Sequence, residues 1–455
     1  MVQIDTDALA ALRAVETELG RRWPESRIEP SLNRIAALVD LLGMPQRSYP
    51  VLHIAGTNGK TSVARMLDAL LRGIGLRVGR YTSPHLQRVT ERISLYGAPI
   101  GPERYVEAYQ DIERYVAMVD AGSQVPMSTF EVLTGMAFAT FADAPVDAAV
   151  VEAGLGGSWD ATNVADATVA AITPVAVDHV NYLGSDIAGI AAEKAGIIKP
   201  GSVVVLAAQP PEVTRVITAR SVEVGATVAR EGMEFGVLHR DIAAGGQLLR
   251  LQGLGGLYDE IFLPLHGEHQ ARNAVLALAA AEAFFGAAGR RSLDVDAVRD
   301  AFATVTAPGR LERVRAAPSV LLDGAHNPHG ARALAAALRE EFAFRRLLAV
   351  VGVMRDKDVA GILAELAPVV DEVVVTASSS RRAMDVDELA AVAREVVGEQ
   401  RLRVEPRLPE AIETAVASAE EIAPGQDRSS GAGVVITGSV AMVGEARTLF
   451  GREPQ

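Results

Sequence analysis

Short apolar runs alternate with helix-like stretches along most of the chain. The first unit pairs an apolar run, residues 49–56, with an amphipathic stretch that begins near residue 60. In that stretch Val63, Met66 and Leu67 fall at spacings of three and four, which places them on one face of a helix. The repetition of such strand–helix units predicts an α/β fold with a mainly parallel sheet.

Reactive or charged side chains follow four of the predicted strands. A glycine-rich turn with Lys60 follows the first strand, and Ser83 follows the next. Glu152 ends a third strand, and Asp178 and His179 end a fourth, which we expect to run from residue 168 to about 180. Ligands of open α/β sheets gather beyond the carboxyl ends of the strands. The four strand ends therefore predict one binding site.

The pattern changes twice in the second half of the chain. From Gly225 to Pro264, short alternating runs with glycines predict hairpins, and two helices follow. Pro308 and Gly309 then mark a linker, after which strands and helices alternate again. We expect three parts: a larger domain over residues 1–306, a linker over 307–312 and a smaller doubly wound domain over 313–455.

The composition is that of an ordinary globular protein, with 49% apolar and 22% charged residues among 455. The net charge of −13 speaks against a general nucleic-acid binder. The chain has no cysteine, which excludes disulfides, thiolate metal sites and cysteine nucleophiles. The N-terminal stretch carries early acids, and the apolar run 274–281 is too short for a bilayer. We expect a cytoplasmic protein without a signal peptide or membrane segment.

Lysine is scarce in this chain. Of the 44 basic residues only four are lysine: Lys60, Lys194, Lys199 and Lys357. An ammonium group is a compact charge that fits among phosphates, and only a primary amine can form a carbamate. Because Lys60 lies in the glycine-rich turn and two others lie in "EKAGIIKP", these lysines are candidates for function.

The turn "GTNGKT" is two residues shorter than the common phosphate-binding pattern G-x-x-x-x-G-K-[ST]. Its context still favours an anion site, because it follows a strand and opens a helix whose first amides carry partial positive charge. Lys60 would place its charge over the β- and γ-phosphates, and the hydroxyl of Thr61 or Ser62 would bind Mg²⁺. The alternative is a purely structural turn.

Further along the chain, four side chains suit a magnesium site. Ser83, Glu152 and His179 form a suitable set around two ions, because Mg²⁺ takes few protein ligands and keeps phosphate and water oxygens. His179 could instead be a core histidine, and Glu152 a helix cap. Lys194 has apolar neighbours, so desolvation would lower its pKa and let it take up CO₂ as a carbamate ligand. The alternative for Lys194 is a surface charge pair with Glu193.

Nine short motifs occur in a fixed order: "GTNGKTS", "YTSPHL…ERI", "TFE", "VVEAGLGGxxDATN", "DHxxxLG", "EKAGIIKPG", "HQxxN", "PGRLE" and "DGAHNP". With them the chain resembles the folylpolyglutamate synthases and dihydrofolate synthases of the Mur ligase superfamily, from about residue 30 to 445. The resemblance implies a P-loop ATPase-type domain with a mostly parallel sheet and a smaller, Rossmann-like glutamate-ligase domain. It also implies ATP-dependent addition of L-glutamate to dihydropteroate, to γ-glutamyl chains of (tetrahydro)folate, or to both, through an acyl phosphate.

The resemblance also assigns the site residue by residue. It implies that ATP is held by Gly56, Thr57, Asn58, Gly59, Lys60, Thr61, Ser62, Asn273, Arg310 and Asp323. It implies two Mg²⁺ ions, held by Ser62, Ser83, Glu152, His179 and Lys194, the last of which is carbamylated in relatives. The folate and the glutamate would meet Phe130, Asp160, Ala161, His326 and Ser439. The groups expected to take part in the chemistry are Lys60, Lys194, Arg310 and His326.

One position departs from the family pattern. Relatives usually carry arginine where this chain has Ser158, so a cation is lost near the expected pterin and glutamate region. This leaves the preferred folate and the balance of the two activities open, but not the ATP chemistry. Members of this type tend to be monomeric, so we expect a monomer whose partners are small molecules, with no nucleic acid and no membrane.

Three competing functions stay open. A cell-wall ligase of the same superfamily would share the loop, a glutamate and the carbamate lysine, although "DGAHNP" favours the folate branch. A nucleotide-hydrolysing switch would need no amino-acid acceptor, and the chain lacks the guanine-reading N-K-x-D. A non-catalytic nucleotide-binding module would not need Glu152, His179 and Lys194 together.

Overall fold

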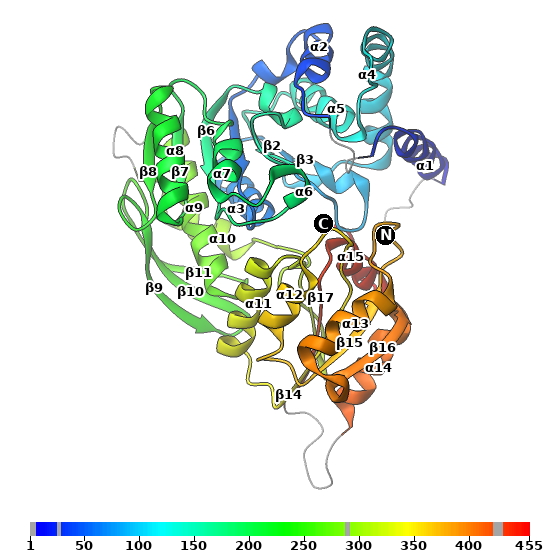
Figure 1. The fold of residues 1–455 in the computed structure, drawn as a ribbon. Coiled ribbons are helices and arrows are strands. Elements are labelled where there is room, and N and C mark those ends of the chain that lie inside the picture. Colours follow the sequence, from blue (N-terminus) through cyan, green and yellow to red (C-terminus); the bar gives the residue numbers. More distant parts are fainter. Residues whose placement is uncertain (1–5, 25–28, 287–291, 422–430) are drawn as a thin grey trace.

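Three sheets order the chain in space. The structure is a computed structural model that describes residues 6–24, 29–286, 292–421 and 431–455. Within these residues an eight-stranded and a three-stranded sheet belong to the first two thirds of the chain, and a six-stranded sheet belongs to the last third. In Figure 1 the first two lie in the blue-to-green half of the molecule and the third lies in the yellow-to-red half.

The largest sheet is mainly parallel, as the sequence pattern predicted. Its strands follow the order β4 (Ala98–Pro99), β3 (Ile93–Leu95), β2 (Val78–Tyr81), β5 (Ala148–Glu152), β1 (Val51–Ala55), β6 (Ala167–Ile172), β7 (Val203–Leu206) and β8 (Thr227–Arg230). Strand β3 pairs antiparallel with both β2 and β4, and the other neighbouring strands pair parallel. All five residues of β1 are buried, which is typical of a central parallel strand covered on both faces.

Helices cover both faces of this sheet (Figure 1). One face packs against α3 (Lys60–Gly73), α9 (Glu268–Phe284) and α10 (Val295–Ala303). The other carries α1 (Thr6–Arg21), α2 (Asn33–Leu41), α4 (Pro102–Gly122), α5 (Thr129–Asp143), α7 (Ile187–Ala195) and α8 (Pro211–Glu223), while the single turn α6 (Val180–Leu183) precedes α7. None of the described helices is long and apolar enough to cross a membrane.

The predicted hairpins form a separate antiparallel sheet. It consists of β11 (Leu257–Leu263), β10 (Gly246–Gln252) and β9 (Gly236–Ala243), in that order. Leu249, Leu251 and Tyr258 of this sheet join the same apolar core as α3 and α9. The small sheet is thus part of the larger half of the molecule.

The last third of the chain forms a second, mostly parallel sheet. Its order is β12 (Glu312–Ala316), β13 (Ser319–Leu322), β17 (Ala432–Thr437), β14 (Arg346–Val351), β15 (Glu372–Ala377) and β16 (Leu402–Arg407). One face packs against α11 (Pro328–Glu341), α12 (Val359–Leu366) and α13 (Val386–Val397), and the other against α14 (Leu408–Glu420) and α15 (Val440–Leu449). The domain boundaries expected at residues 306 and 313 stay a prediction; the first falls between α10 and β12, and the second falls at the second residue of β12.

Two details of the sequence reading are wrong. The strand expected to reach residue 180 ends at Ile172, and Pro174 lies two residues beyond its end. Proline cannot donate to a ladder, so the chain leaves the sheet there, and Asp178 and His179 lie in the following loop. The strand pairs β3–β4 and β12–β13 include short antiparallel edge strands that the alternation of elements did not indicate.

Candidate active site

The glycine-rich turn lies between the end of β6 and the start of α9. Gly56 has φ +143°, and a Cβ there would come within 1.9 Å of the hydroxyl of Thr173. Gly59 has φ +90°, and a Cβ there would lie 2.6 Å from Oδ1 of Asn273. Both the backbone angle and the lack of space therefore require glycine. The turn brings Asn273 of α9, an expected nucleotide contact, directly against the phosphate loop.

Lys60, the first residue of α3, folds back over the turn. Its Nζ donates to the carbonyl oxygens of Gly56 and Thr57, at 3.2 Å each. The ammonium group thus lies at the N-terminal end of a helix, where backbone amides and a cation together form an anion site.

The two hydroxyls after Lys60 have different surroundings. The Oγ1 of Thr61 lies 3.0 Å from both carboxylate oxygens of Glu152. The Ser62 side chain is buried instead, and its Oγ accepts a hydrogen bond from Gln270 at 3.4 Å. Among the two candidates for the metal hydroxyl, the geometry therefore favours Thr61 over the Ser62 that the motif comparison suggested.

Glu152 ends β5 beside the phosphate loop and is 1% exposed. Its carboxylate also accepts from the backbone N–H of Ser83 at 3.4 Å. Burial raises the pKa of Glu152, while the charge of Lys60 and the hydrogen bond from Thr61 oppose that shift. A buried carboxylate that lies beside an anion-binding loop and contacts a hydroxyl group is a suitable ligand for a hard metal ion.

Lys194 points from α7 toward the same loop. Asp186 caps α7 by accepting from the amides of Ala188 and Gly189. The buried Lys194 Nζ donates to the carbonyl of Gly56 at 2.9 Å. Burial lowers the pKa of Lys194 to about 7, helped by the nearby charge of Lys60. The alternative of a surface charge pair is thereby excluded.

His179 precedes α6 in a left-handed conformation, with φ 52°. Its Nε2 lies 3.9 Å from Oδ2 of Asp178. Burial, followed by the charge of Lys357, lowers the pKa of His179 to about 3, so the ring is neutral and its nitrogens can bind a metal. Among the described residues, no three His, Asp or Glu side chains lie close enough together to hold a metal ion by themselves.

The second half of the molecule adds four expected residues. Arg310 Nη1 donates to the carbonyl of Gly309 at 3.0 Å. The buried Asp323 accepts from the amides of Leu311 and Ala325, at 2.9 Å each, and so links the linker to the turn after β13. His326 Nδ1 donates to the carbonyl of Gly324 at 2.8 Å, and Ser439 caps α15.

One cavity of about 840 Å³ joins these groups, and every expected site residue lines it. The lining also includes Phe130, Ala161 and the buried carboxylate of Asp160, which accepts from the N–H of Thr162. Burial raises the pKa of Asp160. The lining of the cavity thus combines the charged groups of the phosphate loop with an aromatic ring and a buried acid.

Known proteins match this arrangement over the whole chain. A family profile described as Mur ligase middle domain matches residues 54–281, and one described as Mur ligase, glutamate ligase domain, matches residues 309–440. A Mycobacterium tuberculosis protein named dihydrofolate synthase/folylpolyglutamate synthase is 59% identical over 466 residues, covering 99% of this chain and 96% of that protein.

The chain belongs to the folylpolyglutamate synthase and dihydrofolate synthase family of Mur ligases. A solved structure of Mycobacterium tuberculosis folylpolyglutamate synthase complexed with ADP has a TM-score of 0.95 and 59% identity, and covers 98% of this chain and 100% of that one. E. coli FolC in complex with DHPP and ADP has a TM-score of 0.83 at 29% identity, with 97% of each chain covered.

Ser158, the position at which we expected a departure from the family pattern, is not among the residues that line the cavity. Its Oγ donates to the carbonyl of Glu193 at 3.1 Å, and its Cα lies 2.5 Å from the place of a Cβ at Gly196. The loop turns the Ser158 side chain toward α7, and the loss of a cation near the expected pterin and glutamate region stays a prediction. The neighbouring Trp159 lines the cavity instead.

The sequence reading missed several lining residues of this Mur ligase. Trp23, which follows α1, and Trp159 are the only tryptophans of the chain, and both line the cavity. Lys357, which was also missed, lines the cavity beside Asp178, a residue that the strand ends had already placed at the site; the two lie 179 residues apart in sequence. Lys357 is one of the four lysines, so the scarcity of lysine was a usable signal for it.

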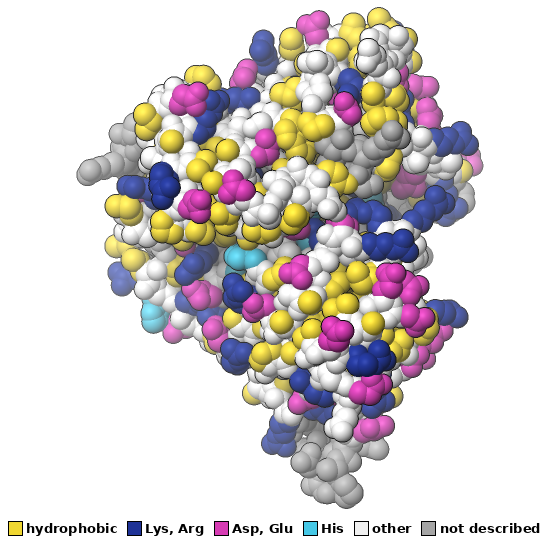
Figure 2. Space-filling model, in the orientation of Figure 1, with side chains coloured by type: hydrophobic (Ala, Val, Ile, Leu, Met, Phe, Trp, Pro, Cys, Tyr) yellow, Lys and Arg dark blue, Asp and Glu magenta, His cyan; other side chains and the backbone are white. Residues whose placement is uncertain are grey.

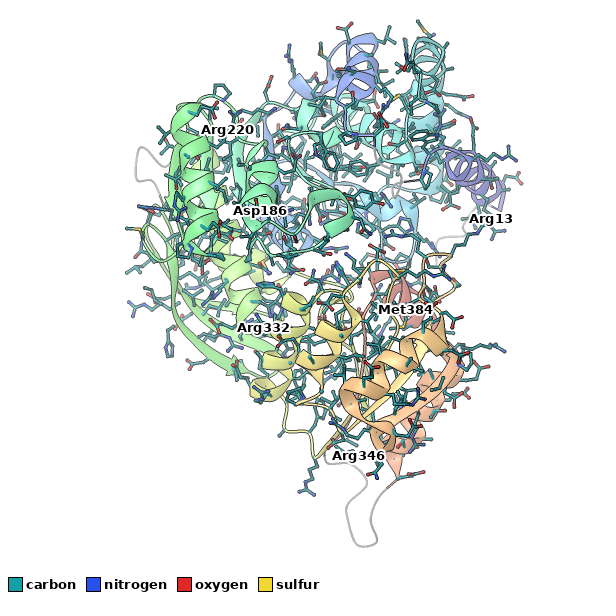
Figure 3. All side chains as sticks on the ribbon, viewed as in Figure 1. Arg13, Asp186, Arg220, Arg332, Arg346 and Met384 are labelled. Carbon is teal, nitrogen blue, oxygen red and sulfur yellow. The ribbon has the colours of Figure 1, made fainter. Side chains whose placement is uncertain are left out.

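The surface in Figure 2 carries charged groups of both signs. In Figure 3, Asp186 lies on the first half of the molecule and Arg332 lies on the second.

Proposed function

We propose that this Mur ligase joins L-glutamate to dihydropteroate, to the γ-glutamyl chain of tetrahydrofolate, or to both, with ATP converted to ADP and phosphate. The observation that supports this most is one cavity that the phosphate loop, His326 and Phe130 line together. It offers room for a nucleotide, an amino acid and a flat aromatic acid at once. The names of the relatives point to the same three substrates.

The reaction has two bond changes. The acceptor carboxylate oxygen attacks the γ-phosphorus, the bond to the bridging oxygen breaks, and ADP leaves. The amine nitrogen of glutamate then attacks the acyl carbon, phosphate leaves with the electron pair, and the nitrogen gives up a proton. Both steps need stabilised charge more than a protein nucleophile, and Lys60 and Arg310 supply it from the two halves of the molecule.

We propose that two Mg²⁺ ions assist this chemistry. Thr61, Ser83 and Glu152 provide hard oxygen donors beside the phosphate loop, which fits one ion that also keeps phosphate and water oxygens. His179 and a carbamate on Lys194 would hold the second. Bound ions neutralise charge on the transferring phosphoryl group.

The remaining residues divide along the cavity. Asn273, with its side chain against the phosphate loop, would contact the nucleotide. His326 and Ser439 lie in the second half and would receive the glutamate, with Asp323 holding their loops in place. Phe130 and Asp160 would bind the pterin, with Ala161 beside them. A monomer suffices, because both halves of the cavity come from one chain.

The test is ADP release by the purified protein with ATP and glutamate, with dihydropteroate and tetrahydrofolate supplied separately. Stimulation by at least one acceptor is expected, and none by a UDP-sugar peptide. Lys60→Ala should abolish turnover. Lys199→Ala is the matched control, since Lys199 lies outside the cavity and donates to the carbonyl of Asn163. ADP release that needs no acceptor would refute the proposal. A failure of both folates to stimulate ADP release would refute it as well.

A further inference from the structure

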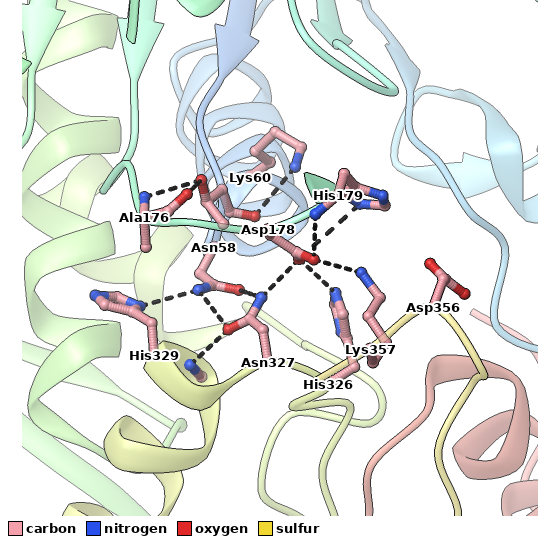
Figure 4. Close-up of polar contacts among 12 residues, drawn as sticks. Asn58, Lys60, Ala176, Asp178, His179, His326, Asn327, His329, Asp356 and Lys357 are labelled. Atoms are coloured by element: carbon pink, nitrogen blue, oxygen red, sulfur yellow. Dashed lines mark hydrogen bonds and ion pairs between the residues drawn. The ribbon is translucent and has the colours of Figure 1, made fainter. Parts of the chain in front are cut away.

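A carboxylate of the first half of the molecule meets three side chains of the second half. Asp178 receives Lys357 Nζ at 2.5 Å and Asn327 Nδ2 at 2.8 Å, and His326 Nε2 lies 3.6 Å away (Figure 4). The side chains of Asp178 and Lys357 are only 7% and 6% exposed. The loop that carries His326 and Asn327 and the loop that carries Lys357 thus meet at Asp178.

Asp178 is itself tied to the phosphate loop. The N–H of Thr57 donates to the carbonyl of Pro174 at 2.9 Å, and the Thr57 hydroxyl both donates to and accepts from Ala176. The N–H of His179 donates to Asp178 Oδ1 at 2.7 Å, which orients the carboxylate. The position of Asp178 is therefore coupled to that of the phosphate loop.

On the other side, Asn327 links Asp178 to helix α11. Its Oδ1 caps the helix by accepting from Gly330 at 2.8 Å, while its Nδ2 donates to Asp178. The amides of Asn58 and Asn327 also exchange hydrogen bonds at 3.1 Å, and Asn58 lies 2.9 Å from His329 Nδ1 (Figure 4). His326 directly precedes this cap, so its backbone is held beside the same contact, and its Nδ1 donates to the carbonyl of Gly324.

Charge explains why an acid is needed at this point. Lys357 faces a site that already contains Lys60, and both charges act on His179. Asp178 faces Lys357, His326 and Asn327, so its carboxylate compensates the buried ammonium group of Lys357. A buried ammonium without its carboxylate would be costly and would turn away from the other cations.

A purely structural ion pair is the simpler alternative, since buried ion pairs are weak evidence for stability. The two halves have another polar contact, however. Glu341 of α11 accepts from the N–H of Gly267 at 2.7 Å, from His266 and from Arg240. The two halves are thus also joined at Glu341, away from Asp178. The contact at Asp178 is therefore not needed only to hold the halves together, and it can position the residues of the site.

We propose that Asp178 is a positioning residue: it docks the loops that carry His326 and Lys357 over the phosphate loop, and so completes the amino-acid side of the site. This inference rests on the proposed function, in which glutamate attacks the acyl phosphate from that side. It assigns to Asp178 no contact with substrate.

The kinetic test compares Asp178→Asn with Asp356→Asn. Asp356 lies in the same loop as Lys357 but pairs with Arg382, at 2.9 Å, and does not line the cavity. Asp178→Asn should lower kcat/KM for glutamate at least about tenfold, with KM for ATP changed less than about twofold, because docking acts on the amino-acid side. Asp178→Asn combined with Lys357→Met should be no worse than the poorer single variant. The proposal would be overturned if Asp178→Asn weakened the kinetic constants for ATP as much as those for glutamate. It would also be overturned if the losses of the two single variants multiplied in the double variant.

A second measurement needs no substrate. Amide hydrogen exchange of the ligand-free proteins should speed up at least about fivefold in peptides spanning residues 324–331 and 353–358 in Asp178→Asn but not in Asp356→Asn. Unchanged exchange in Asp178→Asn would overturn the docking role. If the wild-type protein responds to neither folate acceptor, the proposed function fails, and the exchange data still decide the role of Asp178.

Discussion

Lys194 should take up CO₂ near neutral pH. Its amine is 4% exposed, and its one polar partner among the described contacts is the carbonyl of Gly56, at 2.9 Å. With a pKa of about 7, about half of the amines are neutral at pH 7, whereas an ordinary lysine has roughly one neutral amine in 2,500. The neutral nitrogen attacks the carbon of CO₂, and a proton is released as the carbamate forms. The structure therefore raises the reactive fraction about a thousandfold.

The assay is carbon-13 NMR of the protein in sealed tubes at a fixed concentration of labelled dissolved CO₂. The neutral fraction of Lys194 rises from about a tenth at pH 6 to about nine-tenths at pH 8, so the carbamate signal should grow over that interval. Glutamate ligation should fall when CO₂ is removed and return with bicarbonate. Lys194→Arg should lack signal and activity, while Lys199→Arg should keep both. A signal shared by both variants, or activity indifferent to CO₂, would refute the reasoning.

The same pKa has a consequence for stability. Because the folded protein releases the Lys194 proton more readily than the unfolded chain, this group makes the free energy of unfolding rise with pH between about 7 and 10.5. Below pH 7 Lys194 stays protonated in the folded protein, so the full free-energy cost of burying its charge lowers the free energy of unfolding. Lys194→Met should therefore raise Tm at pH 6 relative to wild type, and a lower Tm there would contradict the burial argument.

Three further outcomes are expected. Thr61→Ala should lower kcat at least about tenfold and raise the Mg²⁺ requirement, whereas Ser62→Ala should change either by less than about twofold; equal losses would contradict the choice of Thr61. Gly56→Ala should lower Tm by a few degrees and abolish ATP binding by calorimetry, because its Cβ would lie 1.9 Å from a neighbouring hydroxyl; Gly20→Ala, with open space, should do neither. The pterin acceptor should quench the fluorescence of both tryptophans, and a Trp23→Phe protein that quenches as fully as wild type would exclude Trp23 from that subsite.

Much of the fold followed from local patterns. The apolar runs at β1 and β5 and the helical spacing of α3 are set by which faces are buried, so periodicity reports them. The end of β6 was misjudged because Thr173 to Val177 are as apolar as a strand, while Pro174 ends the ladder. The short edge strand β4 has two residues, too few for any pattern.

The candidate site was predictable in its chemistry but not in its contacts. Strand ends and motifs indicated Lys60, Glu152 and Lys194, whose residue types carry the chemistry. The residues alone left Thr61 and Ser62 open and the resemblance favoured Ser62, whereas the packing of helix α3 places Thr61 against Glu152.

The sequence by itself determined the order of strands and helices and the glycine-rich turn, because backbone sterics and apolar spacing act over a few residues. Tertiary structure decided the size of the pKa shift of Lys194, because complete burial and the charge of Lys60 lower this pKa, while the adjacent Glu193 acts in the opposite direction. It also decided that Asp178 meets Lys357 across 179 residues. Such a pairing exists only when two separately folded sheets pack together, and no local pattern along the chain encodes it.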